Sequence, residues 1–256
     1  MKTAFNLRQT AFGFVAASMV AALGVASLPV SVYALGSSGT NGFCSGLSAK
    51  AEAANQKVTS LTDKVTQAWS QQDQKLTDSF AKVDASVKDG RKKADSQRQE
   101  DFDKLAAKAK TDAQKQAVTT YKTAIEAAVT TRRDSFDSIR QTYRQALRDT
   151  ISDRRLKISA QQITYKAAVA DAFATAEQSC QNSPKDAASV RVTLLASLKS
   201  AREAYQADRK SDNTVGAKQQ ELAKARNDAF KAATDTFLAS TKAARDALRQ
   251  SFGKEV

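Results

Sequence analysis

The chain has 256 residues, 40 of them basic and 27 acidic, and it contains no histidine, so its formal net charge at pH 7 is +13. The absence of histidine excludes every catalytic or zinc site that depends on imidazole, including histidine-based triads and HExxH motifs. The excess of basic charge favours anionic polymers, lipid headgroups or acidic proteins as partners, and it carries no information about the fold.

The first 34 residues have the pattern of an export signal. Lys2 and Arg8 form a positive start, residues 11–28 are an almost uncharged apolar run, and Val32-Tyr33-Ala34 fits a signal-peptidase site. We therefore expect cleavage after Ala34 and an exported chain that is periplasmic, on the cell surface or secreted. The alternative is an uncleaved membrane anchor, because about 20 apolar residues can span a bilayer.

The remaining chain predicts helices after a short flexible start. Residues 35–46 are rich in glycine and serine, which is typical of a flexible segment. Between residues 47 and 252, by contrast, the only glycines and prolines are Gly90, Gly216 and Pro184. Because the residues that break helices are nearly absent, this stretch predicts a few very long α-helices and an all-α fold.

Large apolar residues recur every eleven positions in two parts of this stretch. The two series are Leu47, Val58, Trp69 and Phe80, and then Ile125, Phe136, Leu147, Ile158 and Val169. Eleven residues in three turns make 3.67 residues per turn, so a hendecad repeat predicts a nearly straight coiled coil. Between the series the phase slips by one residue, and neither residues 88–101 nor residues 106–117 contain a large apolar residue.

The two cysteines of the chain predict one disulfide, Cys44–Cys180, because the chain is exported. Bonded cysteines have Cα atoms within about 7 Å, so the chain between them must leave and return over equal lengths. The midpoint is residue 112, where the apolar phase slips. We expect an antiparallel hairpin over residues 47–181 with its tip near Thr111–Asp112 and legs of roughly 100 Å. A turn at Gly90 is the alternative, and it would need a second reversal near residue 158.

Two shorter helices are expected after the second cysteine. Ser183-Pro184-Lys185-Asp186 supplies an N-cap, a proline at the first helical position and an acid two residues later, and residues 212–216 are typical of a connection. We expect residues 183–253 to form a second, shorter hairpin packed on the base of the first. The predicted architecture is an elongated antiparallel long-helix hairpin with a four-helix bundle at one end and a bare two-helix stalk.

Three arginines form a first candidate site for an anionic partner. Arg140, Arg144 and Arg148 are spaced by four, so they line one helix face, and the planar guanidinium suits phosphate or carboxylate. The alternative is pairing with acids of the neighbouring leg. With the tip at residue 112, residue n faces about 224 − n, which places Arg140 near Asp84 and brackets Arg144 and Arg148 between Asp73 and Asp78.

A basic run forms the second candidate site. Lys88, Arg91, Lys92 and Lys93 would be the first place to expect contact with anionic lipid or nucleic acid. The run contains no aromatic residue on which bases could stack, which argues against recognition of single-stranded nucleic acid. The alternative is a solvated helix face. The sequence shows no catalytic, metal-binding or cofactor-binding motif, so we expect no enzyme activity and no cofactor.

The segment Thr111-Asp112-Ala113-Gln114-Lys115-Gln116-Ala117-Val118 and the spacing of Cys44 and Cys180 resemble Ala/Lys/Arg-rich exported helical proteins of bacteria, a class with no assigned activity. In charge, export and helical hairpin shape the chain is also similar to the periplasmic Skp/OmpH chaperones. It has no strands to build their β-rich trimerisation body. The resemblance implies an exported, non-enzymatic helical protein.

These observations predict a structural or interaction protein of the cell envelope. We expect a rigid basic helical rod that contacts an anionic envelope polymer, a lipid surface or an acidic protein. One alternative is a holdase-type chaperone that grips its clients along the helices. The other alternative is a peripheral membrane-surface binder similar to the exchangeable apolipoproteins.

Overall fold

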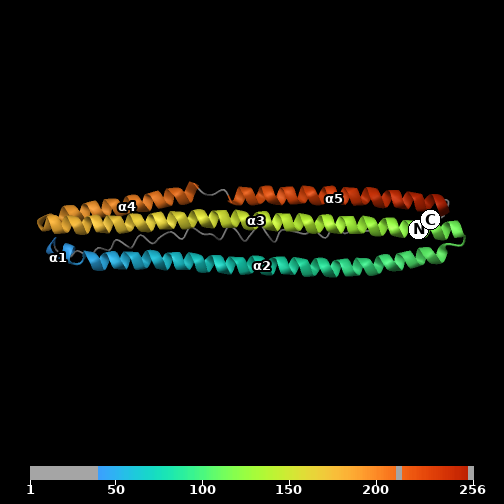
Figure 1. The fold of residues 1–256 in the computed structure, drawn as a ribbon, viewed down its shortest axis with the longest axis horizontal. Helices are drawn as coiled ribbons and strands as arrows, with labels where there is room; N and C mark the ends of the chain where they lie inside the picture. The colour runs from blue at the N-terminus through green and yellow to red at the C-terminus, as the bar shows by residue number, and fades with distance from the viewer. Residues whose placement is uncertain (1–39, 212–214, 253–256) are drawn as a thin grey trace. The chain divides into compact units, whose positions relative to one another are not determined.

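The computed structural model describes residues 40–211 and 215–252, and every element in these ranges is helical (Figure 1). The expected all-α class is confirmed. The expected signal segment, residues 1–34 with its cleavage site, lies outside the described residues. In chain order the elements are α1 (Thr40–Ser45), α2 (Leu47–Lys108), α3 (Asp112–Asn182), a 3₁₀ turn (Pro184–Asp186), α4 (Ala187–Ser211) and α5 (Val215–Phe252).

The chain divides into two compact units, and the two long helices contribute to both. Among the described residues, the first unit comprises residues 40–84 and 166–199. The second unit comprises residues 85–165, 200–211 and 215–252. We describe each unit by itself.

The reversal between α2 and α3 lies in the second unit and takes only the three residues 109–111. The Oγ1 of Thr111 accepts a hydrogen bond from the Gln114 N–H at 3.2 Å. The Oε1 of Gln114 in turn accepts hydrogen bonds from the N–H groups of Lys110 at 2.8 Å and Thr111 at 3.2 Å. This capping box satisfies amide groups that have no helical acceptor at a helix start. The predicted tip near Thr111–Asp112 is confirmed.

Beyond the tip, α2 and α3 of the second unit run antiparallel in the predicted register. The buried Phe102 ring meets the Tyr121 ring edge-on at 6.1 Å between centroids. Arg91 donates to the backbone carbonyl of Arg133 at 3.5 Å, which is the residue that the 224 − n rule places opposite it. The alternative turn at Gly90 is wrong, because α2 continues through this residue to Lys108.

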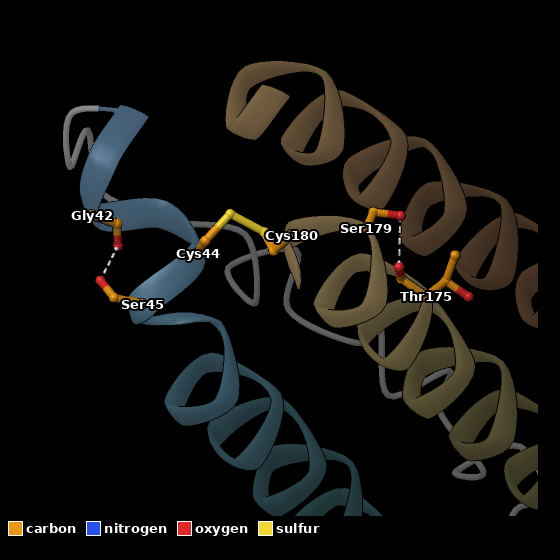
Figure 2. Close-up of a disulfide and its surroundings, with 6 residues drawn as sticks. All are labelled: Gly42, Cys44, Ser45, Thr175, Ser179 and Cys180. Carbon is orange, nitrogen blue, oxygen red and sulfur yellow. Dashed lines mark hydrogen bonds between the residues drawn. A yellow bond between two sulfur atoms is a disulfide. The ribbon is translucent and has the colours of Figure 1, made fainter. Parts of the chain in front are cut away.

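The first unit contains the disulfide that the sequence predicts (Figure 2). Cys44 of α1 is bonded to Cys180 of α3, and their Cα atoms lie 5.7 Å apart. The two cysteines are 136 residues apart in sequence. In the chain-entropy model, closing so long a loop removes about 5 kcal/mol of conformational freedom from the unfolded chain. The bond therefore ties the start of the helical region to the end of α3.

The expectation of a flexible segment over residues 35–46 is wrong for residues 40–45, which form α1. Phe43 of this helix is only 3% exposed, and the Lys50 ammonium lies 5.3 Å from the centroid of its ring. The disulfide fixes the next residue, Cys44. The glycines and serines of this segment favour flexibility. The buried ring of Phe43 and the disulfide at Cys44 together hold it in a helix. Residues 35–39 lie outside the described part.

Three helices supply most of the apolar core of the first unit, to which α1 adds Phe43. Helix α4 begins after the 3₁₀ turn, where the Asp186 N–H donates to the Ser183 carbonyl at 3.0 Å. Ser183 makes no side-chain capping bond, so its predicted role as an N-cap is limited to the backbone. The core residues, all buried, are Leu47, Ala54 and Val58 of α2, Val169, Phe173 and Ala176 of α3, and Ala187, Val190, Leu194 and Leu198 of α4.

The expected position of the last helix is wrong. In the second unit, Phe230 of α5 packs on Phe136 of α3 with ring centroids 4.7 Å apart, and Arg226 of α5 lies over Tyr143 of α3. Tyr205 of α4 contacts Tyr165 of α3 at 5.1 Å. Helices α4 and α5 therefore both run antiparallel to α3 and do not form a hairpin. The physical reason is that Phe136 is one of several large side chains on a second side of α3, which a hairpin at the base would leave uncovered.

The helical conformation of Gly90 predicts a stabilising substitution. Gly90→Ala should raise the free energy of unfolding by about 0.5–1 kcal/mol, because alanine loses less backbone entropy than glycine in a helix interior. An added Cβ would meet no atom within 4 Å. Urea denaturation measures the change.

Gly216→Ala is the matched control, since its Cβ also meets nothing but the residue lies in the first turn of α5. Its effect should be smaller. A loss of stability on Gly90→Ala would contradict a continuous α2.

Candidate functional site

The most connected group of charged side chains joins α2 to α3 in the second unit. Arg91 of α2 donates two hydrogen bonds to the carboxylate of Asp137 of α3, at 2.7 and 2.9 Å. Four residues further along each helix the donor lies on the other helix. There Arg133 of α3 donates two hydrogen bonds to the carboxylate of Asp95 of α2, at 2.6 and 3.1 Å. We call these four residues the ion-pair cluster. Each pair has the two-pronged geometry that makes guanidinium–carboxylate contacts strong and directional.

Two more arginines flank the ion-pair cluster. Arg98 pairs with Asp95, and Arg140 pairs with Asp137, each across one turn of its own helix. Each carboxylate therefore faces two guanidinium groups. The side chains of Arg91 and Arg133 are 30% and 28% exposed, and those of their aspartates 50% and 43%. Because water reaches these groups, their pairing stabilises the unit only modestly and weakens with salt.

The arginines change the acidity of the aspartates they bind. A hydrogen bond from Arg133 lowers the pKa of Asp95, and one from Arg91 lowers the pKa of Asp137, in each case despite partial burial, which acts in the opposite direction. A carboxylate with a lowered folded-state pKa stabilises the fold above its unfolded pKa. This contribution is lost as the pH falls through the folded-state pKa.

The ion-pair cluster occupies the place where the sequence lacks large apolar residues. Between residues 85 and 101 of α2, and between residues 126 and 142 of α3, no side chain is buried. The half-buried positions on α2 include Val87, Arg91, Asp95 and Arg98, which follow each other at helical spacing on the side toward α3. Charged pairs thus take the place of buried apolar packing in a stretch of nearly five helical turns.

The arginine next to this cluster contacts a different helix. The guanidinium carbon of Arg132 lies 4.9 Å from the centroid of Phe136 and 4.8 Å from that of Phe237 on α5. Burial lowers the pKa of Arg132, and the positive charge of Arg133 acts in the same direction. Arg226 of α5 lies in the same way over Tyr143, at 4.6 Å. On the side toward α5, therefore, α3 uses aromatic rings and cation–π contacts.

Arginine and lysine occupy different places in the described residues. Of the 15 arginines whose side chains are described, 12 are half-buried, and the exposed ones are Arg148, Arg245 and Arg249. Of the 21 lysines whose side chains are described, all are exposed except Lys50 and Lys122. Guanidinium groups suit contacts between helices because they bind carboxylates with two prongs and stack on rings, whereas the ammonium group is strongly hydrated. Most of the exposed positive charge is therefore carried by lysine.

The structure separates the four residues of the predicted basic run. Arg91 turns inward to Asp137, so its guanidinium is already bound within the molecule. Lys88, Lys92 and Lys93 are exposed, and their ammonium groups make no ion pair or hydrogen bond with a described residue. These three residues, which we call the lysine group, remain candidates for contact with an anion.

The predicted line of arginines is not a set of equivalent groups. Arg140 pairs with Asp137 of its own helix and its side chain is 17% exposed. Arg144 is half-buried and Arg148 is exposed. Both Arg144 and Arg148 have partners within the structure, as do Asp73 and Asp84. A clamp for an external anion formed by all three arginines stays a prediction.

Other kinds of site find little support in the described residues. A shallow groove in the first unit is lined between Ser48 and Asp63 by side chains of α2 alone, so it does not bring groups from separate elements together. No three cysteine, aspartate or glutamate side chains within residues 40–211 and 215–252 are placed to hold a metal ion. No helix in these ranges has the length and hydropathy needed to cross a membrane.

Sequence reasoning missed the ion-pair cluster and the capping box for different reasons. Thr111-Asp112-Ala113-Gln114 carries the spacing of a capping box and could have been recognised as a helix start. Arg91 and Asp95, by contrast, are indistinguishable from surface charges until α3 is placed beside them. Comparison of the chain with protein-family models, curated proteins and solved structures finds no match.

The ion-pair cluster predicts a measurable coupling across the two helices. Arg91→Asp and Asp137→Arg should each lower the free energy of unfolding, because each places like charges side by side. The double variant restores opposite charges and should recover most of the loss. We expect a coupling energy of about 1 kcal/mol in urea denaturation, the upper end for partly exposed pairs.

The matched control is Lys224 with Asp228, an exposed pair 2.9 Å apart on one turn of α5. Exchanging these two residues should give a smaller coupling, because both side chains are well exposed to solvent. A coupling between residues 91 and 137 no larger than this would show that the ion-pair cluster does not hold α2 to α3.

Proposed function

We propose that this chain is a non-enzymatic, exported structural or interaction protein of the cell envelope that contacts an anionic polymer through the lysine group. Export is supported by the Cys44–Cys180 disulfide, since such bonds form and persist in oxidising compartments. A partner of negative charge is supported by the net charge of the chain.

The observation that carries the proposal is the difference between the lysines of α2 and those of α5. On α5, Lys224, Lys231 and Lys242 each bind an aspartate four residues on, at 2.9, 2.8 and 2.7 Å. The hydrogen bonds that Lys224 and Lys231 donate to these aspartates raise the pKa of both lysines. The lysine group of α2 has no such partners among the described residues. It is one place where exposed ammonium groups can meet an external anion without breaking a local pair.

The spacing of the lysine group suits a flexible polymer. Lys88 and Lys92 are four residues apart, so their side chains are neighbours on the helix surface, and Lys93 follows directly. Three like charges at this spacing repel each other, and a bound anion would relieve that repulsion. An ammonium group is a point charge on a flexible stem and imposes little geometry on its partner. Binding would accordingly be weak for each group, additive along a polymer and sensitive to salt.

A membrane surface is the second candidate partner, and one observation favours it. Leu156 and Ile163 of α3 are 67% and 70% exposed and lie seven residues apart, which places them on one helix face. Exposed apolar side chains next to basic charge are typical of helices that lie on lipid headgroups. The two partners differ in whether these apolar residues contribute to binding.

The proposal predicts that charge at the lysine group matters more than equal charge elsewhere. Replacing Lys88, Lys92 and Lys93 together by Gln should weaken binding to linear polyphosphate at least tenfold, given a contribution of about 1 kcal/mol per lysine near an anionic surface. The matched control replaces Lys224, Lys231 and Lys242 by Gln, which changes the net charge by the same amount. Titration calorimetry at two salt concentrations measures both.

Equal weakening by the two triple variants would contradict a site at the lysine group, as would binding that salt does not affect. Vesicles with anionic phosphatidylglycerol headgroups distinguish the second candidate. If the Leu156→Ser and Ile163→Ser double variant loses vesicle binding and keeps polyphosphate binding, the membrane is the partner that uses this face.

A further inference from the structure

The segment of α2 that contains the ion-pair cluster differs from its neighbour toward the tip. Residues 88–101, which we call the polar segment, contribute no buried side chain. Immediately beyond it, Phe102 is 5% exposed and packs on Tyr121, and Ile125 of α3 is 7% exposed. The hairpin is therefore closed by apolar packing next to the tip and by charged pairs along the polar segment.

The side of α3 that faces α5 is held by different forces along the same stretch of the helix. Arg132 and Phe136 of α3 contact Phe237 and Phe230 of α5 through rings and a guanidinium stacked on them. Contacts between apolar or aromatic side chains lose little strength when salt is added, because they do not depend on attraction between opposite charges. The contacts of Arg91 and Arg133 with their aspartates depend on it directly, and these groups are partly exposed to solvent.

From this difference we propose that the polar segment of α2 detaches from α3 as ionic strength rises, while α5 stays packed on α3. The charged pairs weaken because the screening length falls from about 10 Å at 0.1 M salt to about 3 Å at 1 M. Phe102 and the capping box at residues 111–114 keep the tip closed. The opening is thus internal to the hairpin and reversible. It frees the guanidinium groups of Arg91 and Arg133, whereas Asp95 and Asp137 each keep an arginine of their own helix as neighbour.

Distances between spin labels test this opening in the full chain. One label pair, on Ala94 of α2 and Ser138 of α3, spans the polar segment; both positions are exposed. The other pair, on Ser138 and on the exposed Ala232 of α5, spans the aromatic side. Labels carried by non-native amino acids leave the disulfide intact. Between low and about 1 M NaCl, the 94–138 distance should lengthen by about 5 Å, half a helix diameter, and the 138–232 distance should stay constant.

Two variants show whether the ion-pair cluster causes the change. Replacing all four of its residues by leucine should abolish the salt-dependent shift, since apolar contacts replace the charges. If that variant does not fold, Arg91→Lys with Arg133→Lys keeps the charges and removes the two-pronged geometry, so the shift should occur at lower salt. The proposal is overturned if the 94–138 distance is unaffected by salt, or if both distances lengthen together. It is also overturned if the leucine variant shifts as the native chain does.

Discussion

The pairing of α2 with α3 through Arg91–Asp137 and Asp95–Arg133 sets how these two helices of the second unit are aligned, because no side chain of α2 is buried between residues 85 and 101. Charged pairs of this exposure contribute little net stability. Their effect on geometry is larger. In one pair the arginine belongs to α2, and in the other, four residues further along each helix, it belongs to α3. Both carboxylates therefore find an arginine on the other helix in only one alignment of α2 with α3. A slip of α2 by one turn would place Arg91 opposite Arg133 in one direction, or Asp95 opposite Asp137 in the other.

Much of the hairpin follows from the sequence, since its constraints are local or topological. The absence of helix breakers defines the helices, and the two cysteines place the reversal near residue 112, where α3 in fact begins. The same reasoning could not find the role of Arg91, because its partner is 46 residues away in the chain. It also placed α5 at the wrong end of α3. The side chains that hold α5, among them Phe136 and Phe230, look like ordinary core residues until two faces of α3 are distinguished.

The different use of arginine and lysine connects the fold with the proposed function. Arginine joins the helices to each other, both at the ion-pair cluster and over the rings of Phe136 and Tyr143. Lysine forms the basic surface, and α2 and α5 differ in whether that surface is already neutralised by local aspartates. The net charge counts arginine and lysine alike, so it does not reveal that the two residue types occupy different places. Burial separates most of the basic groups that join the helices from the basic groups at the surface.

The most direct test of the ion-pair cluster is an NMR titration of the side-chain carboxyl carbons of Asp95 and Asp137. If Arg133 and Arg91 bind them as the structure shows, both should titrate below the ordinary aspartate pKa of 3.8. In an Arg133→Gln variant, Asp95 alone should return toward that value. Titration of both aspartates at or above 3.8 in the native chain would contradict the account, because α2 and α3 would then not be joined by these pairs.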